Sequence, residues 1–230
     1  MEETALKRTS GRGRFVTFEG GEGSGKSTHI KRLAERLEAW KVHVIATREP
    51  GGSPGAEIIR HLVLSGMGKL LGPDAETLLF AAARDDHVRT VILPALNRGT
   101  WVLCDRFVDS TRVYQGKAGH VTPGLVNAMQ RVTIGDLKPD LTFILDVPVE
   151  VGLKRAAARR GGAAPDRFES EDLKFHQELR EAYRDIAAAE AERCVLIDAS
   201  ADIDAVAHHV WMALYDRVFA APAGNVAGRA

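Results

Sequence analysis

Short apolar runs alternate along the chain with longer segments in which apolar residues recur every three or four positions. The short runs are rich in β-branched and aromatic residues and predict strands at 15–19, 42–47, 101–105, 141–146 and 194–198. The longer segments predict helices at about 26–40, 55–64, 74–97, 123–135, 148–158, 171–191 and 202–219. Because helices separate each strand from the next, the pattern predicts an α/β fold with a mostly parallel five-stranded sheet and helices on both faces.

The length of 230 residues suits one α/β domain. We expect that domain at residues 14–219, with a mobile N-terminal arm at 1–13 and a frayed C-terminal tail at 220–230, where small and polar residues prevail. No apolar stretch approaches the ~20 residues of a membrane span, and the acidic N-terminus does not resemble a signal peptide. Cys104 and Cys194 fall in apolar strands and fit buried, reduced thiols. These features predict a cytoplasmic protein.

Acidic and basic residues balance at 31 each. A balanced chain has no overall basic field of the kind that attracts nucleic acid. We therefore expect small-molecule ligands, with neither nucleic acid nor a membrane as partner, and with positive charge gathered locally.

The segment between the first strand and the first helix is the most informative. It matches the G-x-x-x-x-G-K-[ST] pattern of a phosphate-binding loop with Gly20, Gly21, Glu22, Gly23, Ser24, Gly25, Lys26, Ser27 and Thr28. Glycines let consecutive backbone amides converge on phosphate oxygens, and the following helix directs its N-terminus at the anion. Lys26 is expected to contact the β and γ phosphates, and the Ser27 hydroxyl to bind Mg²⁺. The segment predicts binding of a nucleoside triphosphate.

Charged residues follow two further strands at the edge where doubly wound sheets bind ligands. Arg48 and Glu49 begin a Pro-Gly-Gly loop, and are either part of a solvated turn or contacts to a substrate phosphate. Asp105 is either a turn or helix cap or a ligand of the metal, directly or through water. Arg106 follows it and is an unusual residue beside a core strand.

Two further groups of residues suit a nucleoside. Phe80 and Arg84 share one helix face, where they are either ordinary core and surface residues or a ring that stacks on a base and a guanidinium that donates to a base carbonyl. The segment after the third strand gathers hydroxyl, aromatic and amide side chains suited to a sugar and base: Ser110, Thr111, Tyr114 and Gln115.

A segment rich in Gly, Ala and Pro interrupts the helical pattern at about 155–168 and carries Arg155, Arg159 and Arg167. A charged run of this kind is either a solvated loop or a short mobile lid. In a lid, the arginines would neutralise charge on a transferring phosphoryl group.

Four segments together resemble the thymidylate kinase family: 18–28, 47–52, 105–116 and 145–155. The first is shared with many nucleotide-binding proteins, whereas the order and spacing of the other three are specific. The resemblance covers about residues 14–219 and implies a three-layer P-loop NTPase-like fold. It also implies a homodimer that uses Mg-ATP to phosphorylate thymidine 5′-monophosphate to the diphosphate, a step of dTTP synthesis.

The resemblance assigns roles in acceptor binding. Phe80 would stack on thymine and Arg84 would contact the base, with Thr111 and Gln115 at the base edge and Tyr114 under the deoxyribose. Arg48, Glu49 and Arg106 would surround the acceptor phosphate, and Glu22 would reach the 3′-hydroxyl. Two departures from the family pattern are Phe107, where Tyr or His is common, and the run 117–120, which replaces a more glycine-rich one.

The phosphate loop contains no basic residue besides Lys26, so similarity to the bacterial type implies that the lid supplies the transition-state arginine. Arg155, Arg159 and Arg167 are the candidates. Because the acceptor is already a phosphate, no strong general base is required, and Asp105 is assigned with Ser27 to magnesium.

Other functions are less consistent with the sequence. A GTP-dependent switch protein needs an Asn/Thr-Lys-x-Asp segment that this chain lacks, and a mechanical ATPase usually has Glu after the strand-end Asp, where Arg106 stands. A non-catalytic nucleotide sensor is disfavoured because Lys26, Ser27, Asp105 and the lid arginines are all present. A kinase for another nucleoside monophosphate, or for a deoxynucleoside, remains the alternative.

Overall fold

The sheet of the protein has five parallel strands. The computed structural model describes residues 11–162, 164–165 and 167–220. The strands are β1 (Phe15–Glu19), β2 (Val44–Arg48), β3 (Trp101–Asp105), β4 (Leu141–Asp146) and β5 (Cys194–Asp198). They lie in the order β2-β3-β1-β4-β5, and every neighbouring pair is parallel. The predicted five-stranded sheet is confirmed, with β2 displaced by one or two residues from its expected range.

Helices connect the strands. The α-helices are α2 (Lys26–Ala39), α3 (Pro54–Leu64), α4 (Pro73–His87), α5 (Leu93–Asn97), α6 (Val108–Thr111), α7 (Pro123–Ile134), α8 (Val149–Arg160), α9 (Leu173–Ala189) and α10 (Ile203–Leu214). A 3₁₀ helix, η2 (Met67–Leu71), precedes α4, and three π-helical turns are η3 (Val88–Ile92), η4 (Arg112–Ala118) and η5 (Tyr215–Phe219).

Wider helical turns account for the main differences from the predicted elements. The helix expected at 74–97 is divided by η3 into α4 and α5. Pro94 has no N–H and its ring excludes the carbonyl of the preceding turn, so the regular i to i−4 bonding cannot continue through it. The sequence pattern predicts no helix at 108–118, yet α6 and η4 form there. The helix expected at 202–219 ends in the π turn η5.

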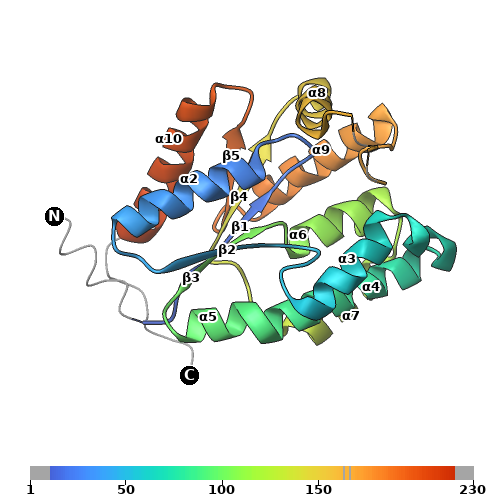
Figure 1. Ribbon diagram of the computed structural model, residues 1–230, viewed down its shortest axis with the longest axis horizontal. Coiled ribbons are helices and arrows are strands. Elements are labelled where there is room, and N and C mark those ends of the chain that lie inside the picture. The colour runs from blue at the N-terminus through green and yellow to red at the C-terminus, as the bar shows by residue number, and fades with distance from the viewer. Residues whose placement is uncertain (1–10, 163, 166, 221–230) are drawn as a thin grey trace.

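Different helices cover the two faces of the sheet (Figure 1). α2 and α10 pack on one face, where Val16 and Phe18 of β1 meet Leu33 of α2 and Val210 of α10. The other face carries Phe15 of β1 and packs against η3, α5 and, farther along, α9. Because both faces are buried, the central strands are mostly apolar, and Thr17 of β1 and Thr142 of β4 hydrogen-bond each other at 2.8 Å.

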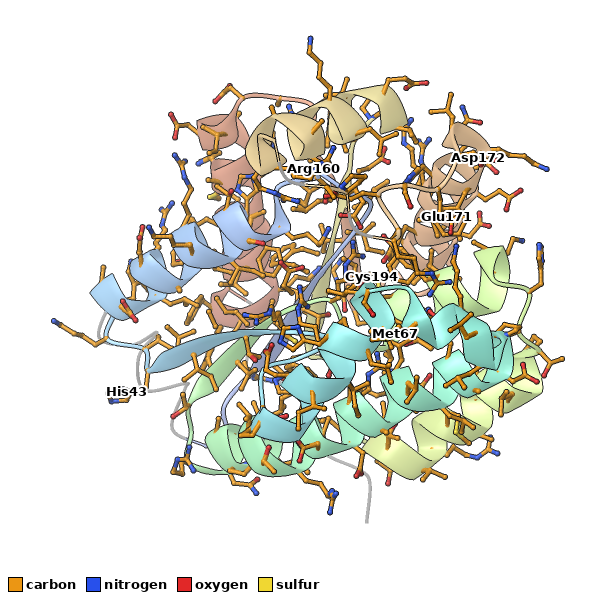
Figure 2. The ribbon with its side chains drawn as sticks, turned by 45° about the vertical axis from the view of Figure 1, so that its right-hand side comes forward. His43, Met67, Arg160, Glu171, Asp172 and Cys194 are labelled. Carbon is orange, nitrogen blue, oxygen red and sulfur yellow. The ribbon has the colours of Figure 1, made fainter. Side chains whose placement is uncertain are left out.

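Both cysteines are buried and free, as predicted. Cys194 lies among the side chains of the interior (Figure 2). Within the described ranges, no helix is long and apolar enough to cross a membrane.

The first described residues already contact the domain. The Gly13 amide donates to the Leu96 carbonyl at 2.8 Å, and Arg14 pairs with Asp140 at 2.9 Å. Residues 1–10 and 221–230, which hold most of the predicted arm and tail, lie outside the described residues.

Candidate active site

A cavity of about 400 Å³ opens at the carboxyl ends of β1, β2 and β3. This is the edge at which open α/β sheets bind ligands. Most of the predicted site residues line it: Glu22, Gly23, Ser24, Gly25, Lys26, Ser27, Thr28, Arg48, Glu49, Phe80, Arg84, Asp105, Arg106, Ser110, Thr111, Tyr114, Gln115 and Arg159. Gly20 and Gly21, at the start of the phosphate loop, line a second, smaller cavity.

Glycine is required in the phosphate loop by close packing as well as by backbone angles. Gly23 has a φ of 65°, and a Cβ there would lie 1.9 Å from the Gly152 carbonyl oxygen of α8. Gly25, with a φ of 93°, caps the N-terminus of α2. The loop therefore rests directly on α8 and directs the positive end of α2 toward the cavity.

Lys26 lies inside the loop. Its Nζ donates to the carbonyls of Gly20 at 3.0 Å and Gly21 at 2.8 Å. Burial, and then the positive charge of Arg106, lower the Lys26 pKa to about 8. The ammonium group is thus desolvated and held by the carbonyls of the loop that would receive phosphate oxygens.

The two predicted magnesium ligands lie together. The Ser27 hydroxyl donates to Asp105 Oδ2 at 2.7 Å, across 78 positions of sequence. Hydroxyl and carboxylate oxygens are the ligand types that Mg²⁺ prefers, so these residues fit the ion. Among the described residues, no group of three or more His, Cys, Asp or Glu side chains could hold a metal. A magnesium ion here would therefore rely on these two oxygens together with substrate phosphates and water.

Arg106 lines the cavity directly after the end of β3. Its backbone is left-handed, with a φ of 68°, which is a strained conformation typical of functional positions. Its guanidinium donates to the Gly20 carbonyl at 3.1 Å, to Ser110 Oγ at 3.2 Å and to Glu22 Oε1 at 2.6 Å. It also lies over the Tyr114 ring, 4.9 Å from the centroid. These contacts fix the orientation of a charge suited to a phosphate.

Glu22 stays ionised despite its position. Burial opposes its ionisation, but Arg106 and Lys26 outweigh this effect and hold the Glu22 pKa at about 2. The Tyr114 hydroxyl also donates to Glu22 Oε1, at 3.0 Å. Glu22 is therefore an acceptor of hydrogen bonds at neutral pH.

Glu19 is a functional residue that the sequence reasoning missed. Its buried carboxylate accepts hydrogen bonds from the Phe107 amide at 2.8 Å, Ser110 Oγ at 2.6 Å and the Tyr183 hydroxyl at 3.2 Å. Burial, and then the charge of Asp109, raise the Glu19 pKa to about 7. These bonds hold the strained turn that places Arg106. The sequence did contain a signal for this role, because a charged residue at the end of a buried strand needs partners.

The base-reading candidates are largely buried. Arg84 is only 5% exposed, so the interpretation of Arg84 as a surface residue is wrong. It donates to Glu49 Oε2 at 2.7 Å, to Thr111 Oγ1 at 2.9 Å and to the Phe107 carbonyl at 3.1 Å. Phe80 belongs to a buried cluster and also lines the cavity, so both of its interpretations fit the structure.

Besides Pro50 and Phe107, which directly follow the predicted Glu49 and Arg106, three cavity-lining residues were not predicted as site residues. Arg60 and Leu64 come from α3, and Phe168 comes from the segment before α9. The Phe168 ring lies 6.3 Å from that of Phe80 and 5.2 Å from that of Tyr114. No sequence motif surrounds Arg60, Leu64 or Phe168, so these residues are recognised as part of the site only from the fold.

The three candidate lid arginines lie in different environments. Arg159 lines the cavity, and its guanidinium lies 3.4 Å from Glu169. Arg155 instead donates to the Ala199 carbonyl at 2.7 Å, and Arg167 pairs with Glu76. Positions 163 and 166 of the predicted lid lie outside the described residues. The structure thus brings one of the three arginines to the phosphate loop.

Neighbouring Arg160 is bound differently from Arg159. It lies on α8, where Figure 2 labels it, and donates to Glu169 Oε2 at 2.5 Å. Its side chain is 24% exposed, against 64% for Arg159. Glu169 therefore pairs with both arginines, and the one that lines the cavity is the more exposed.

Comparison with known proteins agrees with this geometry. The sequence model of the thymidylate kinase family matches residues 18–210. The chain belongs to the thymidylate kinase family. It is therefore a nucleoside monophosphate kinase, a phosphotransferase whose acceptor is thymidine monophosphate.

Thymidylate kinases from two bacteria resemble the chain along its whole length. One from Bradyrhizobium diazoefficiens is 73% identical over 226 residues, which cover 98% of this chain and 99% of the relative. One from Nitrobacter winogradskyi is 73% identical over 230 residues, with both chains fully covered. The crystal structure of thymidylate kinase from Ehrlichia chaffeensis matches with a TM-score of 0.71 at 35% identity, covering 88% of this chain and 98% of that one. The predicted P-loop NTPase-like fold of a thymidylate kinase is confirmed.

Proposed function

We propose that the chain transfers the γ-phosphoryl group of ATP to thymidine 5′-monophosphate, and that the residues lining the cavity bind the two nucleotides and assist the transfer. One observation carries this proposal: a single cavity joins a phosphate loop to the buried Arg84, whose Nη1 has no hydrogen-bond partner among the described residues and suits a base carbonyl. Such a cavity accommodates a nucleotide acceptor in line with a triphosphate donor.

The acceptor would lie between Phe80, Arg84 and Arg106. Phe80 offers a ring for stacking on the base, and Arg84 offers a donor to a base carbonyl. Arg106 and Arg48 supply positive charge for the acceptor phosphate, while Thr111 and Gln115 border the base. Tyr114 borders the sugar, where its ring leaves no room for a 2′-hydroxyl.

The donor would bind along the phosphate loop. Backbone amides of 20–28 and the Lys26 ammonium would contact its β and γ phosphates. Ser27 and Asp105 would hold Mg²⁺, which supplies neutralisation of phosphate charge when it is bound. An oxygen of the acceptor phosphate then attacks the γ-phosphorus, and the bond to the β–γ bridging oxygen breaks to release ADP.

Arg159 is the lid arginine that we assign to the transition state. It lines the cavity and is 64% exposed, and among the described residues its ion pair is with Glu169, at 3.4 Å. Glu169 is only 8% exposed but keeps its ion pair with Arg160, so the exposed Arg159 guanidinium can exchange Glu169 for a phosphate oxygen at low cost. We propose residues 155–168 as the lid, which would also exclude water from the transferring group.

The test is coupled ADP release from the full chain with Mg-ATP and each common nucleoside monophosphate. We expect thymidine monophosphate to give the highest kcat/KM. Preference for another acceptor would keep the phosphate-transfer assignments and overturn those for base recognition.

We also propose that the chain forms a homodimer and acts in the cytoplasm. The exposed apolar residues Ile58, Leu70 and Leu78 support self-association because they come from α3, η2 and α4, which contact one another. The two free, buried thiols fit a reducing compartment. Light scattering with size-exclusion chromatography should give twice the chain mass, and Leu70→Asp should shift the distribution toward the monomer.

A further inference from the structure

His87 lies beneath the acceptor side of the cavity without lining it. It is fully buried at the end of α4, three residues after Arg84. Its Nδ1 lies 3.0 Å from Glu49 Oε1, and its Nε2 lies 2.7 Å from Thr47 Oγ1. The ring therefore joins α4 to both β2 and the loop that follows it.

The hydrogen-bond network specifies the tautomer of this ring. A carboxylate only accepts hydrogen bonds, so Nδ1 carries the proton and donates to Glu49. In the neutral ring, Nε2 then accepts from the Thr47 hydroxyl. His87 thereby uses both ring nitrogens, each in one defined role.

The two carboxylate oxygens of Glu49 bind two different residues of α4. Its Oε1 accepts from His87, and its Oε2 accepts from Arg84 Nε at 2.7 Å. Because each oxygen is held by a buried donor, the carboxylate cannot rotate. The bonds of Arg84 Nη2 to Thr111 and to the Phe107 carbonyl complete the restraint on the guanidinium. Within the described residues Nη1 has no hydrogen-bond partner, so Nη1 is the group left for a base carbonyl.

Close packing at Gly52 adds an independent constraint on the same contact. A Cβ at Gly52 would lie 2.4 Å from Thr47 Oγ1 and 2.5 Å from His87 Nε2. Gly52 has a φ of 84°, which side chains rarely adopt. The backbone of the loop therefore lies directly over the His87–Thr47 bond, and the path of the loop that carries Arg48 and Glu49 depends on His87.

We propose that His87 is a positioning residue for acceptor specificity: it fixes Glu49 so that Arg84 presents Nη1 to a carbonyl oxygen of the acceptor base. This rests on the proposed function, since it takes Arg84 as the reader of the base. A guanidinium only donates hydrogen bonds, so a base with an amino group at that position is rejected only while Arg84 is held in place. His87 thus acts through Arg84 on the choice between thymidine and deoxycytidine monophosphates.

The test compares His87→Leu with His87→Asn in the full chain. Leucine fills similar space without a donor, whereas an asparagine amide donates from nearly the position of Nδ1. For His87→Leu we expect kcat/KM with thymidine monophosphate to fall about 10- to 100-fold, the effect of one hydrogen bond to a charged group. The loss should appear in KM for the acceptor, with KM for ATP unchanged, and preference over deoxycytidine monophosphate should fall with it. His87→Asn should restore most of both.

Two results would overturn the proposal: a folded His87→Leu enzyme with acceptor KM and preference within twofold of wild type, or a loss confined to kcat. Thr47→Val provides a second variant that leaves His87 in place, and should change the acceptor KM in the same direction by a smaller factor. A wild-type enzyme without preference for thymidine monophosphate would instead contradict the proposed function, so the two failures are distinguishable.

Discussion

The base-binding residues of the acceptor half and the lid arginine of the donor half differ in how their charged groups are held. On the acceptor side Arg84, Glu49 and His87 are 5%, 6% and 0% exposed and bind one another. On the donor side Arg159 is 64% exposed and makes a 3.4 Å contact to Glu169. The acceptor groups are thus already oriented for a ligand, whereas the lid arginine must change partners in order to act.

The energetics of the two ion pairs explain this difference. Removing one partner of a buried pair leaves an uncompensated charge and costs about 3–5 kcal/mol, so Glu49 and Arg84 stay together. The Arg159 guanidinium is 64% exposed and Glu169 keeps its contact with Arg160, so Arg159 can leave Glu169 on closure for about 0–1 kcal/mol. Rigid acceptor recognition and a movable lid therefore follow from the burial of Arg84 and the exposure of Arg159.

We expect the largest loss of kcat from replacing the lid arginine that is assigned to the transition state. Arg159→Ala should lower kcat by about 10³- to 10⁵-fold, since a transition-state arginine contributes that much in phosphoryl transfer. KM for thymidine monophosphate should change little. Arg155→Ala is the matched control, and steady-state kinetics should show it within about threefold of wild type, because its guanidinium donates to the Ala199 carbonyl. A large loss in Arg155→Ala with a small one in Arg159→Ala would reverse the assignment.

The next largest effect is expected when a residue that contacts the donor or the acceptor phosphate is replaced. Lys26→Ala and Arg106→Ala should each lower kcat/KM about 10³-fold, because each removes a charge directed at a phosphate. Saturation curves should show the Lys26→Ala defect in kcat and KM for ATP, and the Arg106→Ala defect in kcat and KM for the acceptor. Circular dichroism should show that both variants fold. Near-normal rates in either variant would remove that residue from the site.

A stability measurement tests the rigidity of the acceptor half. Glu49→Ala should lower the free energy of unfolding by about 3–5 kcal/mol, because it leaves Arg84 buried without its carboxylate. Arg159→Ala, which removes an exposed side chain and leaves Glu169 paired with Arg160, should cost about 1 kcal/mol or less. Urea denaturation of the two variants gives both values. Equal losses would mean that the acceptor pair is no more buried in solution than the lid pair.

The smallest expected effect is on the pH dependence of stability and comes from Glu19 at the end of β1. Its pKa is raised from 4.5 to about 7, so the folded protein binds this proton more tightly than the unfolded chain. The resulting penalty is absent below pH ~4.5 and complete above pH ~7, and it amounts to about 3 kcal/mol. Glu19→Gln should therefore gain stability relative to wild type as the pH rises from 5 to 8 in urea titrations. Exposed Glu35→Gln is the control, and parallel pH profiles for Glu19→Gln and wild type would contradict the raised pKa.

The sequence predicts the residues that would contact the ligands better than the residues that hold them in place. Lys26, Ser27 and Asp105 were predictable because a loop motif and strand-end positions specify them locally. Glu19, His87 and Phe168 were not, since their roles depend on neighbours such as Tyr183, which lies 164 positions from Glu19. The split of the lid arginines likewise depends on tertiary partners that no local pattern encodes.

The π turns escaped prediction for a related reason. Hydrophobic periodicity reports which side of a segment is buried, and a widened turn changes that period only slightly. Thus η3 falls inside a helix that was otherwise predicted, and η4 falls in a polar segment where no apolar period stands out.

Calorimetric titration of thymidine monophosphate into the nucleotide-free protein tests the central claim most directly. If the acceptor half is formed in advance and the lid arginine acts later, wild type and Arg159→Ala should bind the acceptor with the same Kd, without ATP. Arg159→Ala should nevertheless lose turnover. Acceptor binding that requires an ATP analogue, or that weakens about tenfold or more in Arg159→Ala, would contradict this account.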